Sequence, residues 1–492
     1  MLSAVIGPIR LLDHRARMNI FLIIVAIVMT VMVAVASIYV LVYFQAEEDN
    51  LTAWAPKVAV VVGLTLSCLL VLLLPMDVAN RSTSGGLDME LCYEIMYAAI
   101  FIMVVGILPF LIFYYEAEDP ESRNWQIWTA IKYEFITLVV AITTLVLMWV
   151  FLGTAEIPIV EYTFNQTLLE MDESCSRDEC PSSGKDSSFE IQVTPVVYIM
   201  ALSSFIGWFL LVVFGGIGLS AFPADLIVSY SDRPQPIDLQ EFAKQKMALH
   251  ERGEKLKEIG EKLGPDASHA RGKKGRMYNQ FKQAVFFLEK DWEKVQVAYK
   301  QGGGNPLMQM FQVVLGFVFL VLSIVWVLHI ILYVFVSPPP TQFLNEYFAK
   351  LDDFFPLFGT VSYGIFAFYL LLCVIKGCFK FGLRFFCMQI HPMRIGATMM
   401  NSMMFNVMLL LLTSVSIVQF CAVAFASYAR LTAVDMLFGV QVRNLVFFQW
   451  FYQHDVFLYA ILFVAFLATA WLSICPRDKK AMEDEDEVLL SI

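Results

Sequence analysis

The strongest constraint on this chain is a series of long apolar runs that carry few charges. Each run has roughly 18 or more residues, which is enough for a helix to cross about 30 Å of hydrocarbon. The composition agrees, because 58% of the 492 residues are hydrophobic and 16% are charged, whereas soluble proteins have about 45–50% apolar and about 25% charged residues. We therefore predict an all-α, polytopic transmembrane helical bundle of about nine spans. The runs cover 20–44, 58–75, 92–115, 128–152, 193–214, 308–336, 357–375, 398–427 and 456–474.

The runs divide the chain into four parts. Residues 1–222 are predicted to form an N-terminal membrane bundle of five spans, and 308–475 a C-terminal bundle of four. A hydrophilic part, 223–307, lies between them, and an acidic tail, 476–492, follows the last span. The first run is too long for the apolar region of a signal peptide, so we expect it to be retained as a helix.

The loop 153–192 indicates the orientation in the membrane. It contains a glycosylation sequon at Asn165 and two cysteines, Cys175 and Cys180, with four residues between them. Both features are typical of an oxidising, glycosylating compartment, so we predict a lumenal loop with a glycan on Asn165 and a Cys175–Cys180 disulfide. Basic residues in 376–397 place that segment and the tail in the cytosol. The arginines before the first span and a sequon in the first loop favour the opposite orientation.

The hydrophilic part predicts a cytosolic antiparallel helical hairpin. Its first half has one apolar seam with a seven-residue repeat, and its second half has a seam with steps of three, four and seven, so the two seams can close on each other. A Gly-Pro breaker at 264–265 separates the halves, and three glycines at 302–304 end the hairpin. The seam residues are Phe242, Leu249, Leu256 and Leu263, then Met277, Phe281, Leu288, Trp292, Val295 and Tyr299.

Four polar residues at membrane depth are candidate functional groups, because burying a charge in hydrocarbon costs several kcal/mol. His329 lies in the sixth span and is either a proton-sensitive group or a neutral histidine bonded to a neighbouring helix. Lys132 and Glu134 lie at the start of the fourth span. They either form a charge relay or extend their side chains to the membrane interface. Asp77 follows Pro75, which predicts that the second span ends there and that Asp77 bonds to nearby backbone.

No catalytic signature is present in the sequence. Zinc motifs, phosphate-binding glycine loops and nucleophile elbows are absent, and the six histidines are scattered. We therefore expect no enzyme activity, no metal and no bound cofactor. Although the net charge is −11, acidic runs account for much of it, and no basic patch suggests binding to nucleic acid. The bilayer is the expected partner, and association into homo-oligomers is compatible with the sequence.

The acidic tail contains a run with the form of a sorting signal. Glu485, Leu489 and Leu490 have the acidic-x-x-x-Leu-Leu spacing that cytosolic clathrin adaptors read. The signal predicts a multi-pass protein of endosomes, lysosomes or vacuoles, with the plasma membrane as the alternative location.

Motifs in order along the chain resemble those of one known family. The run 73–77 (Leu-Leu-Pro-Met-Asp) is followed by 109–110 and 113–116, by 130–133, and by 218–223 (Gly-Leu-Ser-Ala-Phe-Pro). Together with nine spans and a cytosolic hairpin, this order resembles the limb-region and lipocalin-interacting membrane receptor (LIMR) family. The Tyr-Tyr-Glu run at 114–116 and the acidic tail are most similar to the lysosomal, cobalamin-related branch.

The resemblance implies residence in the lysosomal membrane and support of cobalamin export beside an ABC transporter, with cobalamin as cargo. Other relatives imply a different class, a receptor or trafficking adaptor that acts through the cytosolic hairpin. The chain departs from the lysosomal branch at 428–455, a short loop without a sequon where that branch has a long glycosylated one. No residue motif for corrin binding can be carried over.

Overall fold

The structure is a computed structural model of the 492-residue chain. It describes residues 20–45, 54–82, 87–117, 123–162, 184–231, 235–263, 273–300, 306–336, 338–381, 384–385, 388–389 and 398–474.

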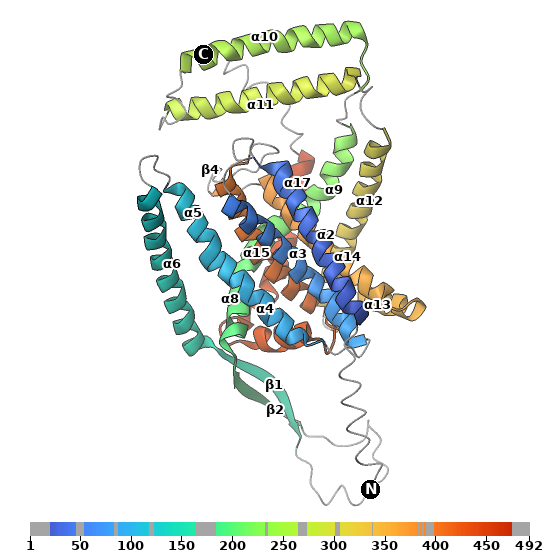
Figure 1. The fold of residues 1–492 in the computed structure, drawn as a ribbon. Coiled ribbons are helices and arrows are strands. Elements are labelled where there is room, and N and C mark those ends of the chain that lie inside the picture. Colours follow the sequence, from blue (N-terminus) through green and yellow to red (C-terminus); the bar gives the residue numbers. More distant parts are fainter. Residues whose placement is uncertain are drawn as a thin grey trace, which may run out of the picture. The chain divides into compact units, whose positions relative to one another are not determined.

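Within these ranges, nine helices are long and apolar enough to cross a membrane, which confirms the predicted all-α polytopic class (Figure 1). They cover Phe21–Phe44, Trp54–Arg81, Met89–Glu116, Trp125–Leu152, Pro195–Tyr230, Leu307–Val334, Phe358–Cys378, Met400–Ala424 and Val456–Ser473.

Several of these spans are built from consecutive helical elements. The third joins α4 (Met89–Ile102), the π-helix η2 (Met103–Ile107) and α5 (Leu108–Glu116). The fifth joins α8 (Pro195–Leu210), η3 (Leu211–Gly215) and α9 (Gly216–Ser231), and the sixth joins α12 (Pro306–His329) and η5 (Ile330–Val334). The others are α2 (Ile20–Phe44), α3 (Trp54–Ser82), α6 (Arg123–Leu152), α14 (Phe358–Phe381), α15 (Met400–Ala424) and α17 (Val456–Ile474).

The second and fifth spans continue past their predicted ends at residues 75 and 214. The helix α3 continues through Pro75 to Ser82, and α9 continues through Pro223 to Ser231. A proline removes one hydrogen bond from the helical ladder, and packed membrane helices tolerate this loss when neighbouring groups satisfy the freed carbonyl.

The compact unit formed by 1–219 and 324–466 has α15 at its centre. Of the most apolar window of α15, 83% is buried, and the helix packs on α3, α8 and α14. Helices from the N-terminal and C-terminal membrane parts of the sequence are therefore joined in one core. Gln419 of α15 helps to join them, since its Oε1 accepts hydrogen bonds from Trp208 Nε1 at 2.9 Å and from the Ser204 hydroxyl of α8.

Glycines allow the helices of this unit to approach closely. A Cβ built on Gly207 would lie 2.2 Å from the Leu412 carbonyl oxygen, and one on Gly218 would lie 1.8 Å from the Cys373 carbonyl oxygen. Only a residue without a side chain fits such contacts. These glycines hold α8 against α15 and the start of α9 against α14.

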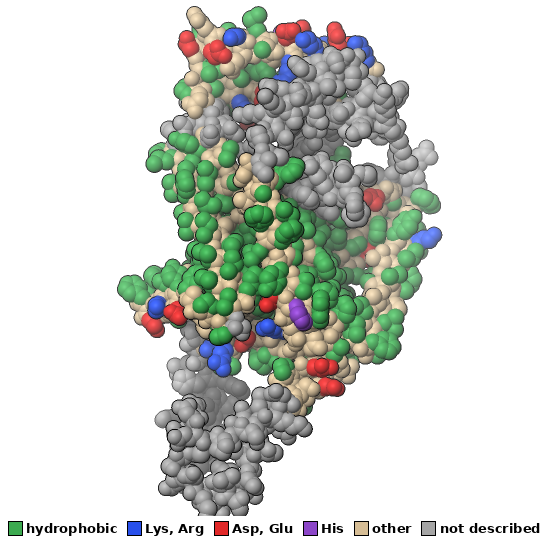
Figure 2. All heavy atoms as spheres, turned by 180° about the vertical axis from the view of Figure 1, so that it is seen from behind, with side chains coloured by type: hydrophobic (Ala, Val, Ile, Leu, Met, Phe, Trp, Pro, Cys, Tyr) green, Lys and Arg blue, Asp and Glu red, His purple; other side chains and the backbone are tan. Residues whose placement is uncertain are grey.

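The outward surface of the membrane helices is apolar. Figure 2 shows hydrophobic side chains over most of the lateral surface of these helices, with few charges among them. None of the most apolar window of α6 is buried within the protein, and for α2 the buried share is 11%. Such a surface needs lipid around it, as the sequence predicted.

The loop 153–192 contains a β-hairpin that the sequence analysis did not predict. Strands β1 (Thr154–Tyr162) and β2 (Gly184–Gln192) pair antiparallel, from Thr154 opposite Gln192 to Tyr162 opposite Gly184. A second, very short pair joins β3 (Arg384–Phe385) to β4 (Met388–Gln389). The protein remains helical in class.

The second compact unit, 220–323 with 467–492, contains the predicted helical hairpin. Helices α10 (Leu239–Leu263) and α11 (Lys273–Lys300) run side by side (Figure 1). Phe242 stacks on Tyr299 with ring centroids 4.3 Å apart, whereas near the other end of α10 a Cβ built on Gly260 would lie 2.8 Å from Phe281. Because early residues of α10 face late residues of α11, the pairing is antiparallel, as predicted.

Candidate functional site

The candidate site is the segment 425–455, which connects α15 to α17. Unlike an ordinary loop it has eleven buried residues among its 31 and contains the short helical elements η6 (Asp435–Gln441), η7 (Val442–Asn444) and α16 (Gln449–Gln453). Buried irregular backbone requires hydrogen-bond partners for its N–H groups. Side chains from α3 and α13 (Phe343–Phe354) supply several of them.

Asp77 is the first of these anchors. Its side chain is 3% exposed, Oδ1 accepts from the Ala433 N–H at 3.2 Å, and Oδ2 accepts from the Val434 N–H at 2.9 Å. The prediction that Asp77 bonds to nearby backbone is therefore wrong, because its partners lie 356 and 357 positions away. The carboxylate satisfies the donors at the start of η6, much as an acidic residue does at a helix N-terminus.

Two buried tyrosines, Tyr93 and Tyr363, lie near Asp77, and a third, Tyr97, packs on η6. Tyr93, Tyr97 and Tyr363 are each 1% exposed or less, and among the described residues their hydroxyls have no hydrogen-bond partner. Tyr93 and Tyr363 lie close enough to Asp77 for its charge to act on them. The Tyr97 ring packs on Phe438 of η6 with centroids 5.8 Å apart. These hydroxyls are free donors inside an otherwise apolar packing arrangement.

A second anchor connects α13 and α14 to Tyr428. Asp352 accepts from the Gly359 N–H at 2.8 Å, from the Thr360 N–H at 3.3 Å and from the Tyr428 hydroxyl. Asn345 Oδ1 accepts from the Tyr428 N–H at 3.2 Å. Burial raises the pKa of the Tyr428 hydroxyl, and its hydrogen bond to Asp352 raises it further, so the phenol remains a neutral donor to the carboxylate.

His329 is the third anchor. The side chain is fully buried, and its Nε2 lies 2.7 Å from the carbonyl oxygen of Ala424, the last residue of α15. Since a carbonyl can only accept, Nε2 donates, and Nδ1 has no hydrogen-bond partner among the described residues. The ring stacks between Tyr333 and Phe425 at centroid distances of 5.0 and 5.2 Å. His329 is therefore bonded to a neighbouring helix, α15.

Two of the four predicted intramembrane residues thus meet at one segment. Asp77 and His329 bind the backbone at 424–434, where the chain leaves α15. Lys132 and Glu134 lie instead on α6, which packs on α5 and η2. Lys132 is exposed, whereas Glu134 is 7% exposed, and neither of its carboxylate oxygens has a hydrogen-bond partner among the described residues.

The arrangement suits rigid positioning better than acid–base or metal chemistry. Within the described ranges, no three His, Cys, Asp or Glu side chains form a group that could hold a metal ion. Asp77 and Asp352 accept from backbone and hydroxyl donors of 425–455, and His329 donates to the carbonyl of Ala424 just before it. The remaining predicted site residues lie outside the described residues: Asn165, Cys175, Cys180, Glu485, Leu489 and Leu490.

The helix α13 and its polar contacts were not predicted from the sequence. The helix buries Leu344, Asn345 and Phe348 on one face, a spacing of one and four that an amphipathic pattern would have revealed. The hydrogen bond between Tyr428 and Asp352 joins residues 76 positions apart, and no local sequence pattern indicates it. Likewise, nothing in the sequence near Asp77 indicates that 433–434 are its partners.

Comparison with known proteins places these features in a family context. The family model described as "LMBR1-like membrane protein" matches residues 22–285 and 305–475. A LIMR family protein from Dictyostelium discoideum is 37% identical over 94% of this chain and 99% of its own length. LIMR family proteins from Oryza sativa subsp. japonica and Arabidopsis thaliana are 32% and 34% identical, over 93% and 92% of this chain and over 96% and 97% of their own lengths. No solved structure matches the chain.

Proposed function

Because the chain belongs to the LMBR1-like (LIMR) family of membrane proteins, we propose that it is an escort protein of lysosomal or endosomal membranes. In this role the hairpin α10–α11 holds a transport partner, and the protein supports export of a small molecule, with cobalamin as the leading cargo. The observation that carries the proposal is a hairpin with its own core and an open groove.

The hairpin has a core independent of any partner. Leu256 and Ala284 are buried against each other, and Ile259, Phe281 and Leu288 pack on them. This apolar seam uses one face of each helix, so the remaining faces are available for binding. A two-helix module with a closed seam is a preformed surface, and a preformed surface loses less conformational entropy when it binds.

A groove on the hairpin supplies the binding surface. Its volume is about 480 Å³, and it lies between the two helices, lined by apolar and polar side chains. Grooves of this kind accept the apolar face of a helix from a partner protein. The lining residues are Gln235, Ile237, Gln245, Ala248, Leu249, Asp291, Lys294, Val295 and Ala298.

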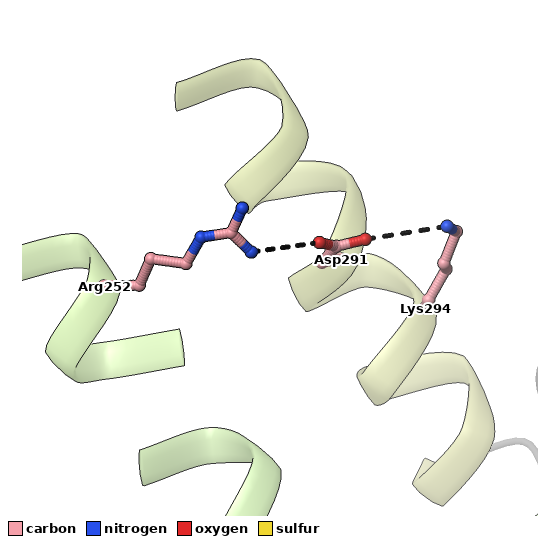
Figure 3. A network of polar contacts seen from close by, with 3 residues as sticks. All are labelled: Arg252, Asp291 and Lys294. Carbon is pink, nitrogen blue, oxygen red and sulfur yellow. Dashed lines mark ion pairs between the residues drawn. The ribbon is translucent and has the colours of Figure 1, made fainter. Parts of the chain in front are cut away.

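Charges at this groove give it a defined polarity. Arg252 of α10 reaches Asp291 of α11 at 3.6 Å, and Lys294 lies 3.6 Å from the other oxygen of the same carboxylate (Figure 3). These side chains are 28–50% exposed, so the pairs contribute about 0–1 kcal/mol each to stability. The ion pairs hold the positive charges of Arg252 and Lys294 in defined positions. These positions favour a partner that has acidic residues beside its apolar anchors.

The membrane unit supports an escort rather than an independent pump. Asp77 and His329 are bonded to the backbone at 424–434, so their polar atoms serve the packing of 425–455. In a chain without a phosphate-binding loop, ATP energy for export would have to come from a partner. An ABC transporter is the partner class that the family resemblance suggests. The tail signal at Glu485, Leu489 and Leu490 supports delivery to endosomes and lysosomes by clathrin adaptors.

The test uses cells that lack the protein and that are rescued by variants of the full chain. We expect null cells to accumulate free labelled cobalamin in lysosomes and wild-type protein to restore release. The Ala248→Arg variant places a long charged side chain at an exposed groove position, so it should reach lysosomes without restoring release. Ala243→Arg, at an exposed position of the same helix that is not among the groove-lining residues, is the matched control and should restore release. Normal cobalamin release in null cells would refute the proposal.

The alternative function is a receptor or trafficking adaptor, for which the same exposed hairpin is the supporting observation. In that case Ala248→Arg should abolish recruitment of cytosolic proteins in co-precipitation, while cobalamin release in null cells stays normal. A Leu489→Ala, Leu490→Ala double variant should then shift the protein to the plasma membrane without affecting recruitment.

A further inference from the structure

A second cavity lies in the membrane unit, on its apolar outer surface. It measures about 820 Å³ and lies between α3, the η2–α5 part of the third span, and α6. The volume is within the range of about 300–1,000 Å³ that is typical of small-molecule sites. Its lining residues are Trp54, Ala55, Val58, Ala59, Val62, Met103, Gly106, Ile107, Phe110, Leu111, Glu134 and Leu138.

Glu134 is the one charged residue of this lining. Its side chain is 7% exposed, and both carboxylate oxygens lack a hydrogen-bond partner among the described residues. Glu134 follows Trp125, the first residue of its span, by nine residues, which corresponds to ~14 Å along the helix. An ionised group at such a depth is strongly disfavoured without a counter-charge.

The backbone around the cavity keeps space open for a ligand. Gly106 lies in the π-helix η2, and a Cβ built on it would meet no atom within 4 Å. By contrast, a Cβ on Gly63, on the α3 helix, would lie 2.5 Å from a methyl group of Val407. Close packing therefore requires glycine at 63, whereas Gly106 borders empty volume. Irregular helical turns of the η2 type are frequent at binding sites.

The chemistry of the lining selects the kind of ligand. Apolar side chains fit a hydrocarbon chain, and the lone carboxylate fits a cation. No Lys, Arg or His is in the lining, so a phosphate-bearing lipid would bring its negative oxygens toward Glu134 without compensation. A lipid with only a hydroxyl group would leave the carboxylate charge unpaired. Lys57 is not among the lining residues, and its Nζ lies 5.3 Å from the centroid of the Trp54 ring at the edge of the cavity.

We propose that this cavity binds a long-chain amine, an amphiphile of the sphingoid-base class, with its ammonium group on Glu134 and its chain between α3 and η2–α5. The ammonium donates to the two carboxylate oxygens, and the apolar side chains of the lining pack on the part of the chain next to it. This ligand differs from the cargo and from the hairpin partner proposed above, and it enters from the membrane.

The test is photolabelling of the full-length protein in phosphatidylcholine nanodiscs with a photoreactive sphingosine. We expect labelled peptides from α3, α5 or α6, with displacement by unlabelled sphingosine. Glu134→Gln keeps the shape of the side chain but removes the charge, so apparent affinity should fall at least tenfold, equivalent to about 1.4 kcal/mol. Gly106→Leu should block labelling by filling the cavity. Lys132→Gln, at an exposed position two residues away, is the matched control and should label like the wild type.

Three further measurements, of thermal unfolding, cholesterol labelling and cross-linking, distinguish the proposal from its alternatives. Without ligand, Glu134→Gln should unfold at a higher temperature than the wild type, because an unpaired buried carboxylate has been removed; a lower temperature would contradict the proposal. A photoreactive cholesterol that labels the same peptides equally in wild type and Glu134→Gln would overturn the choice of an amine. Cross-links between copies of the chain at this surface would overturn a lipid ligand altogether. Equal sphingosine labelling of the wild type, Glu134→Gln and Gly106→Leu would also overturn the proposed amine-binding site.

Discussion

Replacing Asp77 by alanine tests whether the segment 425–455 is held from a distance. The substitution removes acceptors at 3.2 and 2.9 Å from two backbone N–H groups, at Ala433 and Val434. Val434 is fully buried, so its donor has no access to water in compensation. A buried donor without a partner costs about 1–3 kcal/mol, and bonds to a charged acceptor are worth about 1.5–3 kcal/mol each. We therefore expect Asp77→Ala to lower the stability of the membrane unit by about 3–5 kcal/mol.

Asp77→Asn keeps the shape of the side chain but removes its charge, so it shows how much of the stabilisation depends on the charge. The amide retains one acceptor oxygen but turns an NH₂ group toward the second N–H, so the expected loss is smaller, about 1.5–3 kcal/mol. Thermal unfolding in detergent can be followed with a thiol-reactive dye, because Cys373 and Cys421 are buried and react only when the core opens. Asp353→Ala removes an exposed carboxylate and is the control, with an expected change within about 0.5 kcal/mol. If Asp77→Ala unfolds at the wild-type temperature, Asp77 does not hold this segment.

Three other changes test packing, the second anchor and the hairpin. Gly218→Ala places a Cβ 1.8 Å from the Cys373 carbonyl oxygen and should destabilise the protein by about 1–3 kcal/mol or more. Gly106→Ala places a Cβ that meets no atom within 4 Å, so it should be neutral or stabilising by up to about 1 kcal/mol. The same thiol assay distinguishes the two variants. Tyr428→Phe removes the hydroxyl bonded to Asp352 and should cost about 1–3 kcal/mol in that assay, while an unchanged midpoint would show that the bond is unimportant. Leu256→Asp puts a charge in the hairpin core and should make 237–300 sensitive to added protease. The unfolding temperature of the membrane unit in the thiol assay should stay unchanged. Resistance of the variant to protease would contradict the described core.

The elements predicted correctly are those whose cause is local. A run such as 20–44 must be helical and surrounded by lipid because its own length and apolarity leave no other way to satisfy its backbone. The hairpin is similar, since the repeat of Phe242, Leu249 and Leu256 marks one face of a helix without reference to the rest of the chain. The strands β1 and β2 were missed because 21 residues separate them and neither alternates cleanly.

The sequence alone therefore determined the class of the protein, the positions of its spans and the seam of its hairpin, because all three follow from the periodicity and length of apolar stretches. Only the tertiary structure decided which polar groups act together. Asp77 and His329 meet the backbone at 424–434 because α3, α12 and α15 are close in space, although these contacts span 95 to 357 positions. The same holds for Glu134, whose missing partner and apolar surroundings are properties of how α6 packs on η2 and α5. Hydrogen bonding depends on distances of a few tenths of an ångström, and these are set by the packing of the whole bundle.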